Sequence, residues 1–160
     1  MEAHSFDPQS RVWIYTSSRL LSDADVAKLE PAIDDFCTGW TAHNQQLHAG
    51  GLVMYNRYII LVVDETQAGA SGCSIDKSVH FLQEMGKALQ SDFFTRNLVA
   101  FEKGDAIEWI DFKEIPNLLA AGELNAETAV FDTSAATYGE LKNWKKPLSQ
   151  TWMQRYLKTA

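Results

Sequence analysis

A cysteine lies in the most site-like stretch of this sequence. Cys73 falls within residues 70–74, where small residues follow an apolar run and precede a helical pattern. A thiol at a helix N-terminus feels the positive end of the helix dipole, which favours the nucleophilic thiolate. His43 could supply a general base, and Asp64 or Asp76 could orient it. Cys73, His43 and Asp64 are therefore the catalytic candidates of a thiol-dependent enzyme; the alternative is an inert, packed thiol.

The same loop is also suited to binding an anion. Backbone amides and hydroxyls of small residues would gather where a strand passes into a helix, and a hairpin arginine could add a further donor. The plainer interpretation is that Ser74 or Asp76 only caps the helix. We predict a small binding or interaction module with a site for a small anionic ligand within residues 66–76. Its ligand-binding candidates are Arg57, Ser71, Gly72, Ser74 and Asp76.

Metal and nucleotide chemistry have less support in the sequence. The histidines and cysteines show no CxxC, HxxxH or HExxH spacing, so we expect no metal site and no cofactor. Residues 60–65 have the form of a Walker B strand, which holds magnesium in ATPases. Its partner motif, G-x-x-x-x-G-K-[ST], is absent from the sequence. Because one motif without the other does not make a nucleotide site, we read these residues as a buried strand that ends in two acids.

Two amphipathic helices and an apolar strand would position the loop. From Ser22 to Trp40, apolar residues recur every three or four positions, and Pro31 is expected to kink this helix or to begin a second one. Residues 52–64 are long for one strand, so we divide them into a hairpin whose second half is a central strand. After the loop, the helical spacing of apolar residues predicts a second helix over residues 75–89.

The remaining segments complete an α+β pattern. Residues 98–111 predict a hairpin, Pro116 begins a short helix that ends before Gly122, and residues 129–132 predict an edge strand. The end of the chain predicts a pair of helices docked by aromatic residues. This order is similar to a ferredoxin-like βαββαβ sheet with helices on one face, followed by a C-terminal helical extension. The length fits a single domain, residues 1–160.

Composition narrows the range of partners. There are 14 Lys and Arg against 21 Asp and Glu, which gives a formal net charge of -7 and argues against nucleic acid. The longest wholly apolar run, residues 59–63, is too short to span a membrane, and the N-terminus has no signal-peptide pattern. We therefore expect a cytoplasmic protein. An exposed cluster among the five tryptophans would indicate a homodimer or another partner surface.

Four segments carry a resemblance to a known family. They are WTAH at residues 40–43, YNRY at 55–58, VDE at 63–65 and ASGCSIDKSV at 70–79. In these segments the chain resembles uncharacterised bacterial proteins of about this length that are often labelled "ABC transporter ATPase", and the likeness covers nearly the whole chain. It implies no established activity. An ABC cassette needs a phosphate-binding lysine loop and an LSGGQ-type signature, and the sequence has neither.

Overall fold

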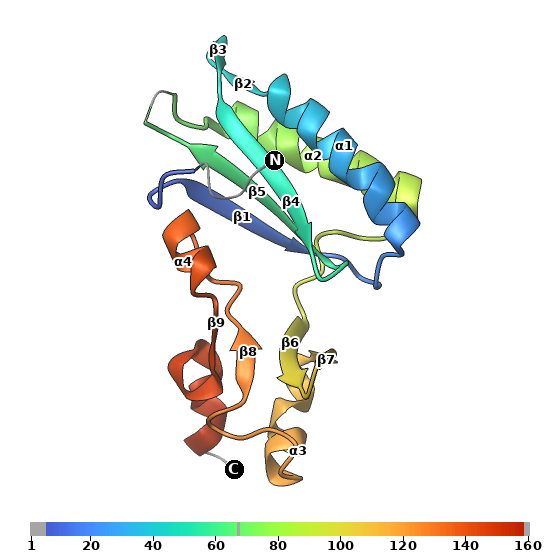
Figure 1. Cartoon of the computed structure of the whole chain (residues 1–160), viewed down its shortest axis with the longest axis vertical. Coiled ribbons are helices and arrows are strands. Elements are labelled where there is room, and N and C mark those ends of the chain that lie inside the picture. The colour runs from blue at the N-terminus through green and yellow to red at the C-terminus, as the bar shows by residue number, and fades with distance from the viewer. Residues whose placement is uncertain (1–5, 67, 159–160) are drawn as a thin grey trace. The chain divides into compact units, whose positions relative to one another are not determined.

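The structure, a computed structural model, describes residues 6–66 and 68–158 (Figure 1). The chain divides into two compact units, each with its own hydrophobic core. Unit 1 holds the chain up to Thr95 together with Ala135–Leu141, and unit 2 holds Arg96–Ser134 and the chain from Lys142 onward. The fold class is α+β, as the sequence predicts. No helix in the described part of the chain is long and apolar enough to cross a membrane.

Unit 1 is built on a three-stranded antiparallel sheet in the order β1-β5-β4. The central strand β5 (Tyr58–Asp64) pairs on one side with β1 (Arg11–Thr16) and on the other with β4 (His48–Met54). Residues 58–63 of β5 are completely buried. A strand covered on both faces must be apolar at every position, and the sequence YIILVV meets that demand. The predicted hairpin and central strand are therefore confirmed.

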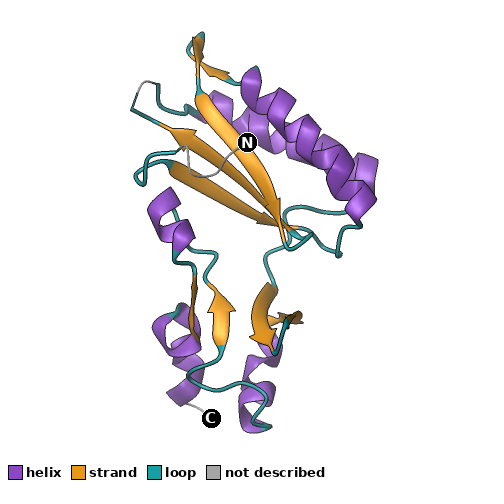
Figure 2. Ribbon diagram, viewed as in Figure 1, coloured by secondary structure: helices purple, strands orange, loops and turns teal. Residues whose placement is uncertain are grey.

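Two long helices, α1 (Asp23–Thr38) and α2 (Gly72–Leu89), lie on one face of this sheet (Figures 1 and 2). Each begins with a capping box, made by Ser22 with Asp25 in α1 and by Ser71 with Ser74 in α2. The helices and the sheet enclose the main core of the unit, which includes Leu29, Ile33, Trp40, Ile59, Leu61, Val63, Leu82 and Phe93.

Shorter elements complete unit 1. A small hairpin, β2 (Thr41–Ala42) and β3 (Gln45–Gln46), follows α1, and its turn residues His43 and Asn44 have positive φ values of 52° and 64°. The helix α4 (Tyr138–Lys142) brings Tyr138 beside Phe6, with their ring centroids 6.1 Å apart. The chain thus returns to unit 1 after it has formed most of unit 2.

Unit 2 contains a four-stranded antiparallel sheet in the order β7-β6-β8-β9. Its strands are β6 (Leu98–Lys103), β7 (Ala106–Asp111), β8 (Ala129–Phe131) and β9 (Lys145–Pro147). The helices are α3 (Ile115–Ala120) and the 3-10 helices η2 (Phe112–Glu114), η3 (Leu148–Gln150) and η4 (Trp152–Lys158). Its core holds Phe101, Ile115, Leu124, Val130, Leu148 and Met153.

The ferredoxin-like arrangement is not evident. Strand β6 pairs with β7 and β8 and does not add a fourth strand to the sheet of unit 1. The outer edge of β1 is already hydrogen-bonded, because Val12 donates its backbone N–H to the carbonyl of Ala136 at 3.0 Å and Arg11 bridges Thr137. A returning loop occupies the position that a fourth strand would need.

Three further predictions need correction. Strand β8 is not an edge strand, since it lies between β6 and β9. The end of the chain forms a strand and 3-10 helices in place of a pair of α-helices. Of the two alternatives at Pro31, the second helical start is wrong, because helix α1 continues through the proline. The proline removes one backbone hydrogen bond from an exposed turn, and the helix keeps its packed face on either side of it.

Candidate functional site

The loop between β5 and α2 is held closed by its own carboxylates. Asp64 accepts a hydrogen bond from the backbone N–H of Thr66 at 3.0 Å, and Glu65 accepts one from Ala70 at 2.9 Å. The bond from the Thr66 amide is the main reason why the pKa of Asp64 lies below its ordinary value. The acids that resemble a Walker B ending therefore fasten this loop.

Most backbone amides at the start of α2 are already hydrogen-bonded within the protein. Ser71 donates its N–H to the Ser74 hydroxyl at 2.7 Å, and the N–H of Ser74 returns to the Ser71 hydroxyl at 3.2 Å. The N–H of Ile75 donates to the carbonyl of Ser71 at 2.9 Å. Within the described residues, only the amides of Gly72 and Cys73 in this turn have no acceptor. The predicted anion site is thereby reduced to two amides.

Arg57 is not brought to this loop. It lies before β5 and the loop lies after it, so the seven-residue strand separates them by about 20 Å. The guanidinium donates to the backbone carbonyls of Ser17 at 3.0 Å and Ser18 at 2.8 Å. Arg57 therefore braces the segment that leads into α1.

The three catalytic candidates lie on separate elements. Cys73 is exposed in the first turn of α2, and His43 lies in the turn of the β2–β3 hairpin. Asp64 faces His48 across the β4–β5 ladder. Over the described parts of the chain, no hydrogen bond or ion pair joins any two of Cys73, His43 and Asp64.

Cys73 does border a groove of about 690 Å³ between α1 and α2. At its centre, Phe36 of α1 and Phe81 of α2 stack with ring centroids 4.5 Å apart and an interplanar angle of 13°. Both rings are half-buried. Residues 73, 77, 80 and 84 follow one another at helical spacing along α2. We call this the α1–α2 groove; it is lined by Phe36, Cys73, Asp76, Lys77, His80, Phe81 and Glu84.

The charged side chains of the groove have few internal partners. Glu84 pairs with Lys87 at 3.3 Å, and both side chains are exposed. Asp76 and Lys77 form no ion pair with any residue that the structure describes. No set of three or more metal-ligating side chains occurs among the described residues. The groove is therefore an apolar floor with a charged rim rather than a metal centre.

Sequence reasoning missed Phe36 and Phe81 as site residues. Phe36 belongs to the apolar stripe of α1, and the stripe alone predicts that its members are buried in the core. Asp76, His80 and Glu84 share one face of α2, which by itself indicates only a solvated surface. The groove is recognisable only when the faces of α1 and α2 are seen packed together, and the pattern of one helix does not show that packing.

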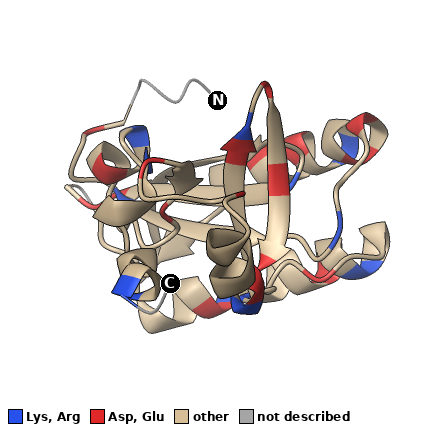
Figure 3. Cartoon of the chain, turned by 90° about the horizontal axis from the view of Figure 1, so that it is seen from below, with Lys and Arg blue, Asp and Glu red and all other residues tan. Residues whose placement is uncertain are grey.

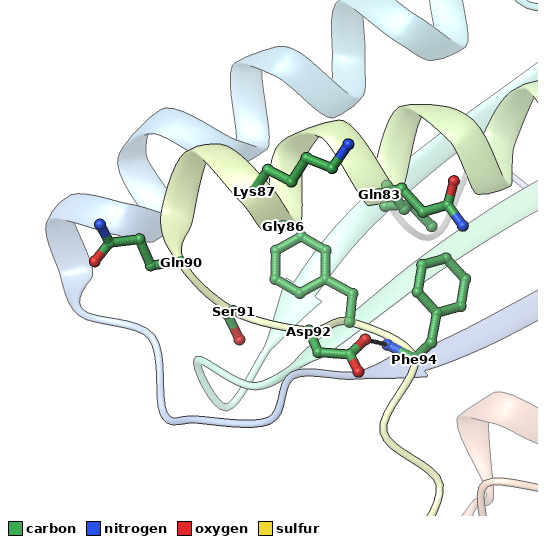
Figure 4. A pocket seen from close by; sticks show the side chains of 9 residues that line it. Gln83, Gly86, Lys87, Gln90, Ser91, Asp92 and Phe94 are labelled. Carbon is green, nitrogen blue, oxygen red and sulfur yellow. Dashed lines mark hydrogen bonds between the residues drawn. The ribbon is translucent and has the colours of Figure 1, made fainter.

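A second cavity, of about 590 Å³, lies at the C-terminal end of α2 (Figure 4). Two of its polar side chains, Ser91 and Asp92, are hydrogen-bonded within the protein. Asp92 accepts a hydrogen bond from the Phe94 N–H at 2.8 Å, and the Ser91 hydroxyl lies 2.5 Å from that of Ser17. The Ser91 N–H donates to the carbonyl of Gly86 at 2.9 Å. These bonds fasten the turn after α2, which makes this cavity a structural feature.

Comparison with known proteins adds no relative. No family model, curated protein or solved structure matches the chain. The resemblance to the bacterial family therefore stays a prediction, and the geometry of the groove is the basis for a functional proposal.

Proposed function

We propose that this protein is a small binding and interaction module whose α1–α2 groove receives the apolar side chains of a short segment of a partner protein. The observation that carries this proposal is the stack of Phe36 on Phe81, two rings that are only partly buried. Aromatic rings bring large apolar area at low cost in side-chain entropy, and an amphipathic segment lying between two helices is a recurrent way to cover them. The size of the groove suits one or two such side chains.

Binding is a better account of this surface than catalysis. His80 lies seven residues after Cys73 on α2, which places the two about 10 Å apart along the helix axis and beyond hydrogen-bond reach. In this proposal, the predicted anion site contracts to the amides of Gly72 and Cys73 at one end of the groove. A carboxylate of the partner could be accepted there.

A peptide of neutral composition tests the proposal. The probe is an amphipathic helix with leucines at helical spacing and only glutamine and serine on its other face, and its fluorescence anisotropy is measured against the protein. We expect saturable binding that is lost after Cys73 is labelled with a bulky maleimide, because Cys73 is exposed at the groove and its modification leaves the core untouched.

The matched control places the same label outside the groove. In a Cys73→Ser protein, a new cysteine replaces Glu108 on β7 of unit 2 and carries the maleimide. Binding should survive this label. Absence of saturable binding to the unlabelled protein, or equal loss with both labels, would contradict the proposal.

A thiol-dependent enzyme that uses Cys73 with His43 and Asp64 is the second candidate. The exposure of Cys73 in the first turn of α2 favours it, since a thiolate there would be accessible and close to the positive end of the dipole. The rate of Cys73 alkylation by iodoacetamide at neutral pH distinguishes the candidates. The enzyme is supported if Cys73 reacts much faster than a free cysteine and if this rate falls in the His43→Ala variant. It is ruled out if the rate is that of an ordinary cysteine and His43→Ala leaves it unchanged.

A further inference from the structure

We infer that the segment bound in the α1–α2 groove is cationic, with Lys or Arg residues beside its apolar side chains. This inference rests on the proposed function and adds the charge of the partner. It follows from the distribution of charged residues along the chain, which Figure 3 marks by colour, and from the residues that line the groove.

The whole negative charge of the protein belongs to the unit that contains the groove. Unit 1 has 6 Lys and Arg against 13 Asp and Glu, a net charge of -7. Unit 2 has 8 of each, a net charge of zero, so that the two together give the -7 of the chain. A cationic segment is therefore attracted to unit 1 before any contact forms.

One of the two helices that form the groove shows the same bias. Helix α1 contains five acidic residues and one lysine, whereas α2 contains two acidic residues and two lysines and is neutral. Asp35, the neighbour of Phe36 in α1, is exposed and forms no ion pair with any described residue. Asp76 and Glu84 line the groove against a single lysine, Lys77. Because Glu84 pairs with Lys87, Asp76 is the one carboxylate of the lining without an ion-pair partner among the described residues. The negative charge beside the groove therefore comes mainly from α1.

The physical consequence is selectivity by charge more than tight binding. Exposed ion pairs each change affinity by a factor of about two to five, and salt screens them over about 8 Å at physiological ionic strength. Two or three carboxylates around one apolar floor would thus separate a basic from an acidic segment by about tenfold or more. The apolar contacts contribute equally to the binding of a basic and of an acidic segment, and the charges around the groove make the difference in affinity between them.

Three versions of one leucine peptide test the inference. They share their apolar positions and carry lysine, glutamine or glutamate at the flanking positions. We expect the lysine peptide to bind at least about tenfold more tightly than the glutamate peptide, with the glutamine peptide between them, and the difference to shrink as salt is added.

Two protein variants of equal net charge locate the effect. Asp35→Asn with Asp76→Asn removes one exposed carboxylate from each helix that forms the groove, and Asp105→Asn with Glu108→Gln removes two exposed carboxylates of unit 2. The first variant should lose most of the preference for the lysine peptide and the second should keep it. Equal binding of the three peptides, or equal effects of the two variants, would overturn the inference and leave the proposed function standing. Failure of all three peptides to bind would overturn the proposed function itself.

Discussion

The two ends of α2 carry cavities of similar size that are built in opposite ways. At the C-terminal end, Arg19 donates to the backbone carbonyls of Leu89 and Gln90, and its guanidinium also pairs with Asp25 at 3.0 Å. The polar groups around that cavity hold the turn together. Toward the N-terminal end, Cys73, Lys77 and His80 project from α2 without a hydrogen bond or ion pair to any described residue.

This difference shows how a structural cavity can be told from a binding surface. Volume does not separate the two, since they measure about 590 and 690 Å³. What separates them is the role of the polar groups at each end: Ser91 and Asp92 are hydrogen-bonded in the turn after α2, whereas the side chains of Cys73, Asp76 and Lys77 in the groove have no hydrogen-bond or ion-pair partner among the described residues. Substitutions at the C-terminal end should therefore lower stability, whereas substitutions in the α1–α2 groove should affect binding and leave stability nearly unchanged.

The largest contrast is expected between the two cysteines. Cys73 borders the groove and is exposed; Cys37 is buried in the core beneath α1, where burial raises its pKa to about 12. Relative to an ordinary thiol, this pKa lowers the thiolate fraction at neutral pH by about a thousandfold. We expect Cys73 to react with iodoacetamide in the native protein and Cys37 to react only after unfolding. Mass spectrometry of the alkylated protein follows both reactions. Equal reactivity of both thiols would contradict the account.

Gly86→Ala should give the largest loss of stability. A Cβ at Gly86 would lie 2.5 Å from the backbone carbonyl oxygen of Ser91, so the turn after α2 would have to shift. Overpacking of this kind costs about 1–3 kcal/mol in free energy of unfolding. Gly72→Ala is the matched control at the other end of α2, because nothing lies within 4 Å of its Cβ position. Urea denaturation compares the two, and similar values would remove the distinction between the ends.

Arg19→Ala should produce a smaller loss. The guanidinium satisfies carbonyl groups at the end of α2, where a positive charge also complements the helix dipole. Its removal should lower the free energy of unfolding by about 1 kcal/mol. Lys77→Ala, which removes a lysine from the groove, should change it by less than about 0.5 kcal/mol. Thermal unfolding of both variants checks this ranking, and a larger loss in the lysine variant would reverse it.

The smallest effect concerns acid stability at Asp25. Its pKa lies below the ordinary value, first because the Ser22 backbone N–H donates to its carboxylate and then because Arg19 does. A carboxyl group with a lowered folded pKa stabilises the fold above its unfolded value, and this stabilisation is lost as pH falls through the folded pKa. Asp25→Asn should therefore flatten the decline in stability below about pH 4. An unchanged or steeper curve in Asp25→Asn would contradict the assignment.

Part of this structure follows directly from the sequence. The run YIILVV predicts a strand covered on both faces, and Ser22 marks the start of α1. The start of α2 is predicted three residues too late, because Ser71 caps the helix in place of Ser74 or Asp76. The second sheet does not follow, because the pairing of β6 with β8 joins segments about thirty residues apart by a single residue pair, Phe101 with Val130. Local patterns fix the type of an element, and long-range pairing decides which sheet it joins.

The candidate site is also only partly predictable, because local patterns identify single residues but not the packing that brings them together. Cys73 and Asp76 stand out by residue type and by their place at a helix start, and both line the groove. Arg57 was grouped with them on the assumption that a hairpin turn would lie near the loop, yet turn and loop lie at opposite ends of β5. Phe36 and Phe81 come from helices separated by four strands in sequence, so their stack depends on packing that no local pattern encodes.

Amide chemical-shift mapping tests the central claim most directly. The labelled protein is titrated with the lysine-flanked leucine peptide, and two-dimensional nitrogen–proton spectra are recorded at each step. The account predicts saturable shifts centred on Phe36, Cys73, His80 and Phe81, with little change from Gly86 to Phe94. Shifts centred on the cavity after α2, or no saturable shifts at all, would contradict it.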